Sequence, residues 1–293
     1  MTIEQFFEVV ANISGVTFVV TSMVAMGLSL TVRMIVAPLR RWVLVLVALI
    51  ANFVVVPLLA IGLAELLSLE ESLRAGLLIL ALAAGAPFLP KLAQGANGDV
   101  AFAVGLMIVL MLLTVVLAPI ALPWLLEGVS ISAWAIAQSL VVLMLVPLAL
   151  ALAVRANWPD VASEYQPPMA KISTFAVIVL LVVALGLNIN NIIDLVGTGG
   201  LLALVLFVTG SLAIGFVAGG REPRIRSVVT LGTAQRNLSA ALVIATQNFS
   251  GTPTLTYVLV GAVIAQIILL LSARPIGRAL GTGSPTPGTN KTI

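Results

Sequence analysis

A run of polar residues near the end of the sequence offers the strongest candidate for chemistry. Residues 232–237 read Gly-Thr-Ala-Gln-Arg-Asn and interrupt the otherwise apolar stretch 225–249. Arg236 lies well inside this stretch, where a charge costs about 2.5 to 3.5 kcal/mol on membrane-insertion scales. We expect its guanidinium to face a wet cavity or an anion. The alternative is that the side chain reaches the cytoplasmic surface near Arg226. That distance is too long for one side chain unless water penetrates.

A second interruption lies at residues 85–90, which read Gly-Ala-Pro-Phe-Leu-Pro. Proline removes a helical hydrogen bond and clashes with the preceding turn, so this segment predicts a broken helix; a simple kink is the alternative. Unwound backbone at membrane depth is tolerated where it lines a cavity, so two interruptions predict one shared site near the membrane midplane. The predicted substrate-binding residues are Gly85, Ala86, Pro87, Phe88, Pro90, Gly232, Thr233, Arg236 and Asn237.

The side chains that the sequence lacks exclude several kinds of chemistry. There is no cysteine and no histidine, which removes thiolate nucleophiles, imidazole bases and the usual zinc ligands. No Asp or Glu lies deep in an apolar stretch, and isolated hydroxyls such as those of Ser22, Thr114 and Ser239 form no catalytic pair. We therefore expect no enzymatic activity, no cofactor and no bound metal, apart from the coupling sodium ion considered below.

Membrane-spanning helices are the elements that must position these residues. Of the 293 residues, 61% are hydrophobic and 9% are charged, which is too apolar for a soluble domain. A span across roughly 30 Å of hydrocarbon needs about 20 apolar residues, and nine stretches approach or exceed that length. They are residues 6–31, 42–67, 73–93, 100–126, 131–154, 169–193, 201–217, 225–249 and 255–278.

The charges between these stretches predict the orientation of the protein. Lys and Arg gather in every second connection, whereas the other connections hold only Arg74 among five acidic residues. Positive charge stays on the cytoplasmic side, which predicts an N-terminus outside and a C-terminus in the cytoplasm of the plasma (inner) membrane. Glu4 and Glu8 precede a full-length span in place of a basic leader, so we expect the first stretch to remain as a span.

The same charges bear on partners and on the end of the chain. The basic residues are scattered singly and in pairs, which does not suggest nucleic acid. We expect the lipid bilayer and a small organic anion as partners and infer no obligate protein partner. Residues 281–293 are rich in Gly, Pro, Ser and Thr, and they predict a disordered cytoplasmic tail after a transmembrane domain that covers residues 1–280.

Two apolar segments suggest internal symmetry. Residues 18–30 (FVVTSMVAMGLSL) and 175–189 (FAVIVLLVVALGLNI) share a Gly-Leu ending and belong to spans five positions apart. Because the two segments are an odd number of spans apart, the second copy would have the opposite orientation in the membrane. We therefore predict inverted repeats at about 6–126 and 169–278. Chance similarity of two helices rich in leucine and valine is the alternative. The two interruptions occupy corresponding spans, and this favours the repeat.

Several motifs together resemble the bile acid:sodium symporter family over nearly the whole chain. The matching segments are Met26-Gly27-Leu28-Ser29-Leu30-Thr31, Asn52-Phe53 with Pro57-Leu58-Leu59, Lys91-Leu92-Ala93-Gln94-Gly95 with Asp99-Val100-Ala101, and residues 230–248. The resemblance implies an all-α polytopic fold in which two discontinuous helices cross inside a core domain. It also implies a separate panel domain and an anionic organic substrate that is taken up between the two domains.

The chain departs from this family where sodium would bind. By the resemblance, the acid and the glutamine on the second broken helix fall at Gly232 and Arg236. Other ligand positions of the family fall at Ala86, Pro87, Ala103 and Met107. Oxygen ligands remain at Asn52, Thr233 and Gln235, and these form the predicted sodium set.

The sequence thus predicts a secondary transporter of small organic anions that works by alternating access around a midplane site. Arg236 supplies positive charge where the family binds cations, so a sodium-independent anion exchanger or exporter is the alternative. A membrane sensor or scaffold that transports nothing is the alternative from another class. Substrate flux through a variant with Arg236→Ala would separate a carrier from a sensor.

Overall fold

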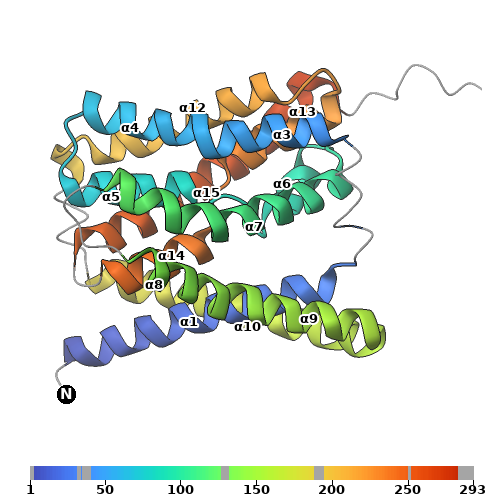
Figure 1. Ribbon diagram of the computed structural model, residues 1–293, viewed down its shortest axis with the longest axis horizontal. Helices are drawn as coiled ribbons and strands as arrows, with labels where there is room; N and C mark the ends of the chain where they lie inside the picture. Colours follow the sequence, from blue (N-terminus) through green and yellow to red (C-terminus); the bar gives the residue numbers. More distant parts are fainter. Residues whose placement is uncertain are drawn as a thin grey trace, which may run out of the picture.

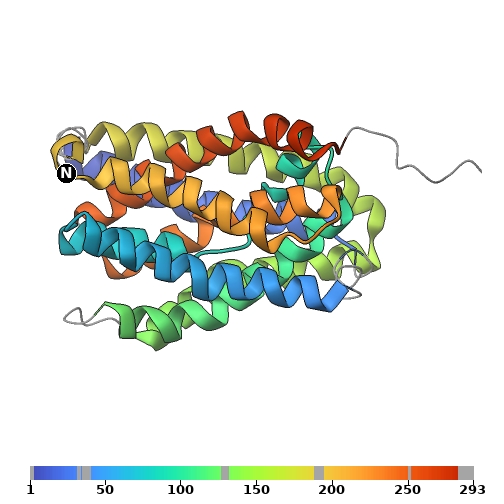
Figure 2. The same ribbon diagram turned by 90° about the horizontal axis from the view of Figure 1, so that it is seen from above.

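The computed structural model describes residues 3–31, 34, 41–126, 132–187, 195–249 and 252–282. Over these residues the chain is helical and contains no strand, which confirms the all-α polytopic fold. Figures 1 and 2 show that most of the helices lie roughly along one direction, as in a transmembrane bundle.

Thirteen α-helices, two π-helical turns and one short 3-10 turn are described. The α-helices are α1 (Ile3–Ser29), α3 (Trp42–Ile50), α4 (Val56–Leu66), α5 (Glu71–Leu82), α6 (Leu89–Gly95), α7 (Val100–Leu125), α8 (Ala133–Leu140), α9 (Val146–Asn157), α10 (Pro159–Leu187), α12 (Gly200–Ala218), α13 (Pro223–Ala234), α14 (Leu238–Asn248) and α15 (Pro253–Leu280). The π turns η2 (Ala51–Val55) and η3 (Val141–Leu145) join α3 to α4 and α8 to α9, and the 3-10 turn η4 (Leu195–Gly197) precedes α12.

Eight helical segments among the described residues are long and apolar enough to cross a membrane. The one predicted span that is not among these eight covers residues 73–93. It is divided between α5 and α6, which have 12 and 7 residues, so neither piece is long enough to cross by itself. All four tryptophans are exposed, as side chains at a membrane interface should be. They are Trp42, Trp124, Trp134 and Trp158.

The connection predicted between residues 154 and 169 is wrong, because this segment is mostly helical. Only Trp158 separates α9 from α10, and Pro159 begins α10, where a missing N–H costs no hydrogen bond. The Arg155 guanidinium joins the two helices by donating to the Ser163 hydroxyl at 2.9 Å. Pro159 therefore marks the beginning of α10.

The helices form two groups. The panel group consists of α1, α8, α9 and α10, and Figure 1 shows them on one side of the molecule. Within it α1 packs extensively against α10 and α9, and a Cβ on Gly27 would lie 2.6 Å from Ala151 Cβ, so glycine permits this close approach. The core group consists of the remaining helices and meets the panel group mainly where α8 contacts α7 and α14.

The end of α15 corrects one expectation about the tail. Gly281 ends the helix with φ +69°, a conformation that favours glycine. The Thr282 side chain is buried, and its hydroxyl oxygen lies 2.7 Å from Ala96 O and 2.9 Å from Gly277 O. Thr282, the second residue of the predicted disordered tail, is therefore packed against α6 and α15, whereas Gly281 is exposed, and residues 283–293 lie outside the described residues.

Candidate functional site

The break between α5 and α6 depends on a glycine as well as on the two predicted prolines. Gly85 has φ +79°, and a Cβ there would lie 2.2 Å from Met111 N on α7. Both facts exclude a side chain, because the left-handed conformation favours glycine and no space is left. Pro90 lies in the first turn of α6, where proline is well tolerated. The backbone between the two helices is thus unwound against α7.

Thr114 on α7 binds the unwound segment, whereas the sequence marked it only as an isolated hydroxyl. Its hydroxyl oxygen lies 3.0 Å from both Ala84 N and Ala84 O, and 3.3 Å from Leu82 O. The hydroxyl accepts from the amide and donates to one carbonyl, so it replaces bonds that an intact helix would make. A lone threonine in an apolar helix gives no specific signal in a sequence.

The break between α13 and α14 meets the first break directly. Asn237 caps α14 by accepting from Ala240 N at 3.1 Å. Its backbone N–H donates to Ala83 O at 2.7 Å, and its side-chain amide donates to Gly85 O at 3.0 Å. The two interrupted helices therefore supply each other's missing hydrogen bonds.

Arg236 lies buried beside this junction and bonds to two oxygen atoms. Its guanidinium donates to Ala81 O at 3.0 Å and to Asn52 Oδ1 at 3.3 Å. The guanidinium carbon lies 5.6 Å from the centre of the Phe207 ring, a distance that allows attraction between cation and ring. Only 4% of Arg236 is exposed, so it does not extend to the surface near Arg226.

No carboxylate among the described residues pairs with Arg236, and its Nε has no hydrogen-bond partner there. A buried charge normally needs a counterion or a full set of hydrogen bonds. The guanidinium has neutral partners for two of its nitrogens only. This arrangement leaves both charge and hydrogen-bonding capacity for an anion.

Asn52 connects Arg236 to Thr233 across two helices. Its side-chain amide donates to Ala48 O at 2.9 Å and to Thr233 Oγ1 at 3.3 Å, while its oxygen accepts from Arg236. Asn52 lies in the π-helical turn η2, directly before α4, whose first turn contains Pro57 without an N–H to donate. Such turns often lie at functional sites.

The predicted sodium set is only partly gathered. Asn52 and Thr233 lie together, but the Gln235 side chain lies against α15, where its amide donates to Gln266 Oε1 at 3.4 Å. Gln235 Oε1 and Gln266 Nε2 have no partner among the described residues. The Asn52 oxygen is already bonded to Arg236, so the oxygens that remain do not converge on one point.

The other predicted residues lie around the junction and not all within it. A Cβ on Gly232 would lie 3.0 Å from Leu89 Cδ2, so an apolar side chain fills the space beside this position. Phe88 is half-buried, and the centre of its ring lies 5.3 Å from Lys91 Nζ. No contact links Phe88 to Arg236. Ala86 is buried, whereas Pro87 and Pro90 are half-buried. The residues brought together are thus Gly85, Asn237, Arg236, Thr233 and Asn52.

The junction offers recognition and no catalytic machinery among the described residues. They contain no cluster of three metal-ligating side chains, and the polar atoms at the junction are amides, hydroxyls, carbonyls and one guanidinium. Such a set can bind an anion and can hold two helices in register.

Comparison with known proteins places the chain in a family. The pattern of the Sodium Bile acid symporter family matches residues 16–195, which is more than half of the chain and includes the first break and Asn52. The match ends before α13, so it does not include the second break. A search of curated proteins gave no match. The chain is an integral membrane protein that belongs to the sodium bile acid symporter family of transporters.

Proposed function

We propose that this protein is a secondary transporter of small organic anions in which Arg236 takes the place of a coupling sodium ion. The observation that supports the proposal is the contact of its guanidinium with Ala81 O and Asn52 Oδ1. A carbonyl and an amide oxygen are ligands of the kind that a hard cation needs. Because a fixed cation already bonds to both oxygens, we expect transport that does not require sodium.

The charge of Arg236 favours an anionic substrate. Its partners among the described residues are neutral, and burial makes an uncompensated charge costly. A carboxylate that enters between the core and panel groups would lower this cost. Movement of one group against the other would then open the site to each side of the membrane in turn.

The membrane potential bears on the direction of transport. When the interior is negative by 100 mV, entry of a monovalent anion is opposed by about 2.3 kcal/mol unless a cation accompanies it. A fixed arginine stays with the protein, so over a full transport cycle it does not change the free energy of moving the anion across the membrane potential. We therefore propose exchange of anions, or export, across the plasma (inner) membrane.

Thermal unfolding of the purified protein tests the sodium part of the proposal. A ligand that binds only the folded state raises stability by RT ln(1 + [L]/Kd), so sodium binding should show as a higher midpoint in sodium chloride than in potassium chloride of equal ionic strength. We expect equal midpoints for the wild-type protein. A rise that is specific to sodium and is absent in Asn52→Ala would contradict the proposal.

Flux in proteoliposomes tests whether the protein transports anions at all. We expect vesicles loaded with cholate to take up labelled cholate by exchange, in potassium as well as in sodium buffer. Arg236→Met removes the charge and keeps most of the volume, and about 3 kcal/mol of lost charged hydrogen bonding should reduce the rate roughly a hundredfold. Arg221→Met is the control, because Arg221 is an exposed arginine away from the junction.

Two flux results would reject the anion proposal. Full activity of Arg236→Met would show that the charge does not act on the substrate. Absence of flux for cholate and for a set of smaller carboxylates, in a protein that unfolds cooperatively, would favour the sensor or scaffold.

A further inference from the structure

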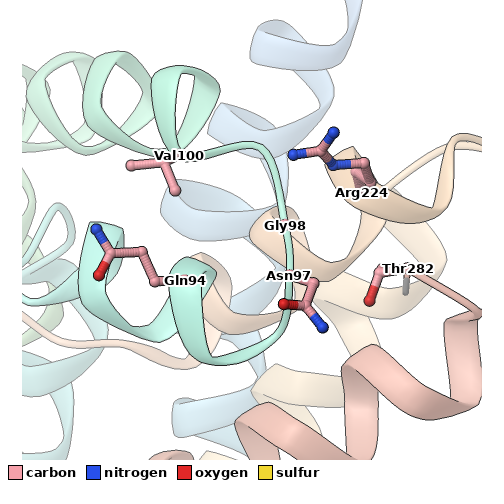
Figure 3. A pocket seen from close by; sticks show the side chains of 6 residues that line it. All are labelled: Gln94, Asn97, Gly98, Val100, Arg224 and Thr282. Carbon is pink, nitrogen blue, oxygen red and sulfur yellow. The ribbon is translucent and has the colours of Figure 1, made fainter. Parts of the chain in front are cut away.

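A second polar region lies at the end of the core group that carries the arginines, away from the junction of the two breaks. A hollow of about 480 Å³ opens at the loop between α6 and α7, and Figure 3 shows the side chains from α6, this loop, α7, α13 and the end of α15 that line it. The loop contributes Gly98 and Asn97, the beginning of α13 contributes Arg224, and the end of α15 contributes Thr282. Nothing in the transport proposal uses these residues.

An adjoining hollow of about 350 Å³ shares two of the same residues. Gln94 and Asn97 line both hollows, and Arg274 and Arg278 from α15 line the second. Three arginines from two helices thus surround a continuous set of neutral amide side chains. Guanidinium groups together with amide donors are the groups that proteins use to bind phosphate oxygens.

The scaffold around the hollows is closely packed. Asp99 N–H donates to Arg224 O at 3.1 Å, which ties the loop to α13. A Cβ on Gly98 would lie 2.7 Å from Ser227 Oγ, and a Cβ on Gly277 would lie 2.4 Å from Ala96 O. The loop, α13 and α15 are therefore held together at distances that only glycine permits, and the arginines extend from a fixed base.

Three other arginines at the same end of the molecule have protein partners, and the exposed Arg221 lines neither hollow. Arg41 forms an ion pair with Glu222, Arg155 donates to Ser163, and Arg226 stacks on Phe216 and donates to its carbonyl. In contrast, the guanidinium groups of Arg224, Arg274 and Arg278 have no protein partner among the described residues. Arginines that serve only to orient the protein need no common location, so their gathering around two hollows requires another explanation.

The nearby carboxylates do not neutralise this cluster. Asp99 accepts from Phe102 N at 2.9 Å as the cap of α7, and Glu222 is bonded to Arg41. Glu222 is thus matched by Arg41, which leaves Asp99 against the three arginines and a net charge of about +2 from these four side chains. An anion with more than one negative charge would match the remaining charge better than a monovalent one.

We propose that the two hollows form a binding site for a phosphate group, held by Arg224, Arg274 and Arg278 with help from the amides of Gln94 and Asn97. Basic pockets between helices at the cytoplasmic face commonly bind lipid headgroups. A phosphate ion or a phosphorylated solute of the cytoplasm would present the same oxygens. The shared chemistry is a phosphate group that can carry two negative charges, and the source is decided by experiment.

The experiment compares two sources of phosphate on the full-length purified protein. In the lipid arm, the midpoint of thermal unfolding is measured in nanodiscs of phosphatidylcholine and in nanodiscs where phosphatidic acid replaces part of that lipid. In the solute arm, the protein in neutral detergent is titrated with inorganic phosphate against chloride at equal ionic strength. Ligand binding to the folded state raises the midpoint in either arm.

The variants are Arg224→Ala and the double variant Arg274→Ala/Arg278→Ala. Arg221→Ala is the matched control, because it removes the same charge from the same end of the molecule without lining either hollow. Each variant must unfold at the wild-type midpoint without phosphate, which shows that it folds. We expect the apparent Kd of the double variant to be at least about tenfold weaker and that of Arg221→Ala to be unchanged.

A rise in the lipid arm alone identifies a headgroup, and a rise with inorganic phosphate identifies a soluble ligand. Absence of a rise in both arms overturns the proposal. An equal loss in Arg221→Ala and in the double variant also overturns it, because the effect would then depend on total charge and not on the hollows.

Discussion

The break between α5 and α6 and the break between α13 and α14 carry opposite hydrogen-bonding groups. The first break presents acceptors, namely the carbonyls of Ala81, Ala83 and Gly85. The second presents donors, namely the Arg236 guanidinium and both N–H groups of Asn237. One break is built from small residues and backbone, and the other is built from polar side chains.

This difference shows why each break depends on its partner. Unsatisfied carbonyls inside a membrane cost several kcal/mol each, and donors without acceptors are equally costly. Joining the two breaks lowers both costs, because the carbonyls of Ala81, Ala83 and Gly85 accept from Arg236 and Asn237. A cation that bound the same carbonyls would have to displace Arg236, so the comparison also leads to the proposal of sodium independence.

Gly85→Ala should have the largest effect, because it disrupts the acceptor side. A Cβ would lie 2.2 Å from Met111 N, and the φ of +79° is unfavourable for alanine. We expect a loss of more than about 4 kcal/mol in the free energy of unfolding, or no folded protein. Thermal unfolding in detergent measures it. Gly62→Ala is the control, since nothing lies within 4 Å of a Cβ there, and it should be neutral or slightly stabilising.

Asn237→Ala weakens the donor side and should cost about 3 kcal/mol. It removes the cap of α14 and leaves Gly85 O without its partner, effects of about 1 and 1 to 3 kcal/mol. Asn237→Ser keeps a capping hydroxyl and should cost less. Both variants lose the amide that donates to Gly85 O, so a midpoint of Asn237→Ser equal to that of the wild type would mean that the bond to Gly85 contributes nothing.

Thr114→Val tests whether the first break also needs support from α7. The hydroxyl bonds to the amide and carbonyl of Ala84, and its removal leaves a buried donor and acceptor. We expect a loss of about 1 to 2 kcal/mol in stability, measured by thermal unfolding. Thr114→Ser keeps the hydroxyl and should retain most of the stability. A neutral Thr114→Val would show that the second break alone satisfies the unwound backbone.

For Arg236→Gln the expected effect is a difference between two salts, which is the smallest of these changes in stability and the most specific one. Removing the fixed cation frees Ala81 O and Asn52 Oδ1, so sodium chloride should raise the unfolding midpoint above that in potassium chloride. At a sodium concentration a few times the Kd, the gain is about 1 kcal/mol. If the variant responds equally to both salts, these oxygens do not form a sodium site, and the replacement of sodium by arginine would be rejected.

The sequence predicted the elements of the site better than their contacts. The prolines of residues 85–90 and the polar run 232–237 each mark a real break, because proline and clustered polar groups cannot continue an apolar helix. The start of α10 was missed because residues 159–168 are largely polar and contain proline, so they lie outside the apolar stretch that predicted the span. Residues 188–194, where the sixth predicted span ends, lie outside the described residues, and the boundaries of the inverted repeats stay a prediction.

Composition and local pattern by themselves determined that the chain is helical, lies in a membrane and has two interrupted helices, since these properties follow from hydrophobicity and backbone chemistry. The tertiary structure decided that Arg236 bonds to Asn52 and Ala81, that Gln235 faces Gln266, and that Thr114 supports the first break. These contacts join residues that are 30 or more positions apart. Helix packing sets them, and the local pattern of a sequence does not record which helices pack together.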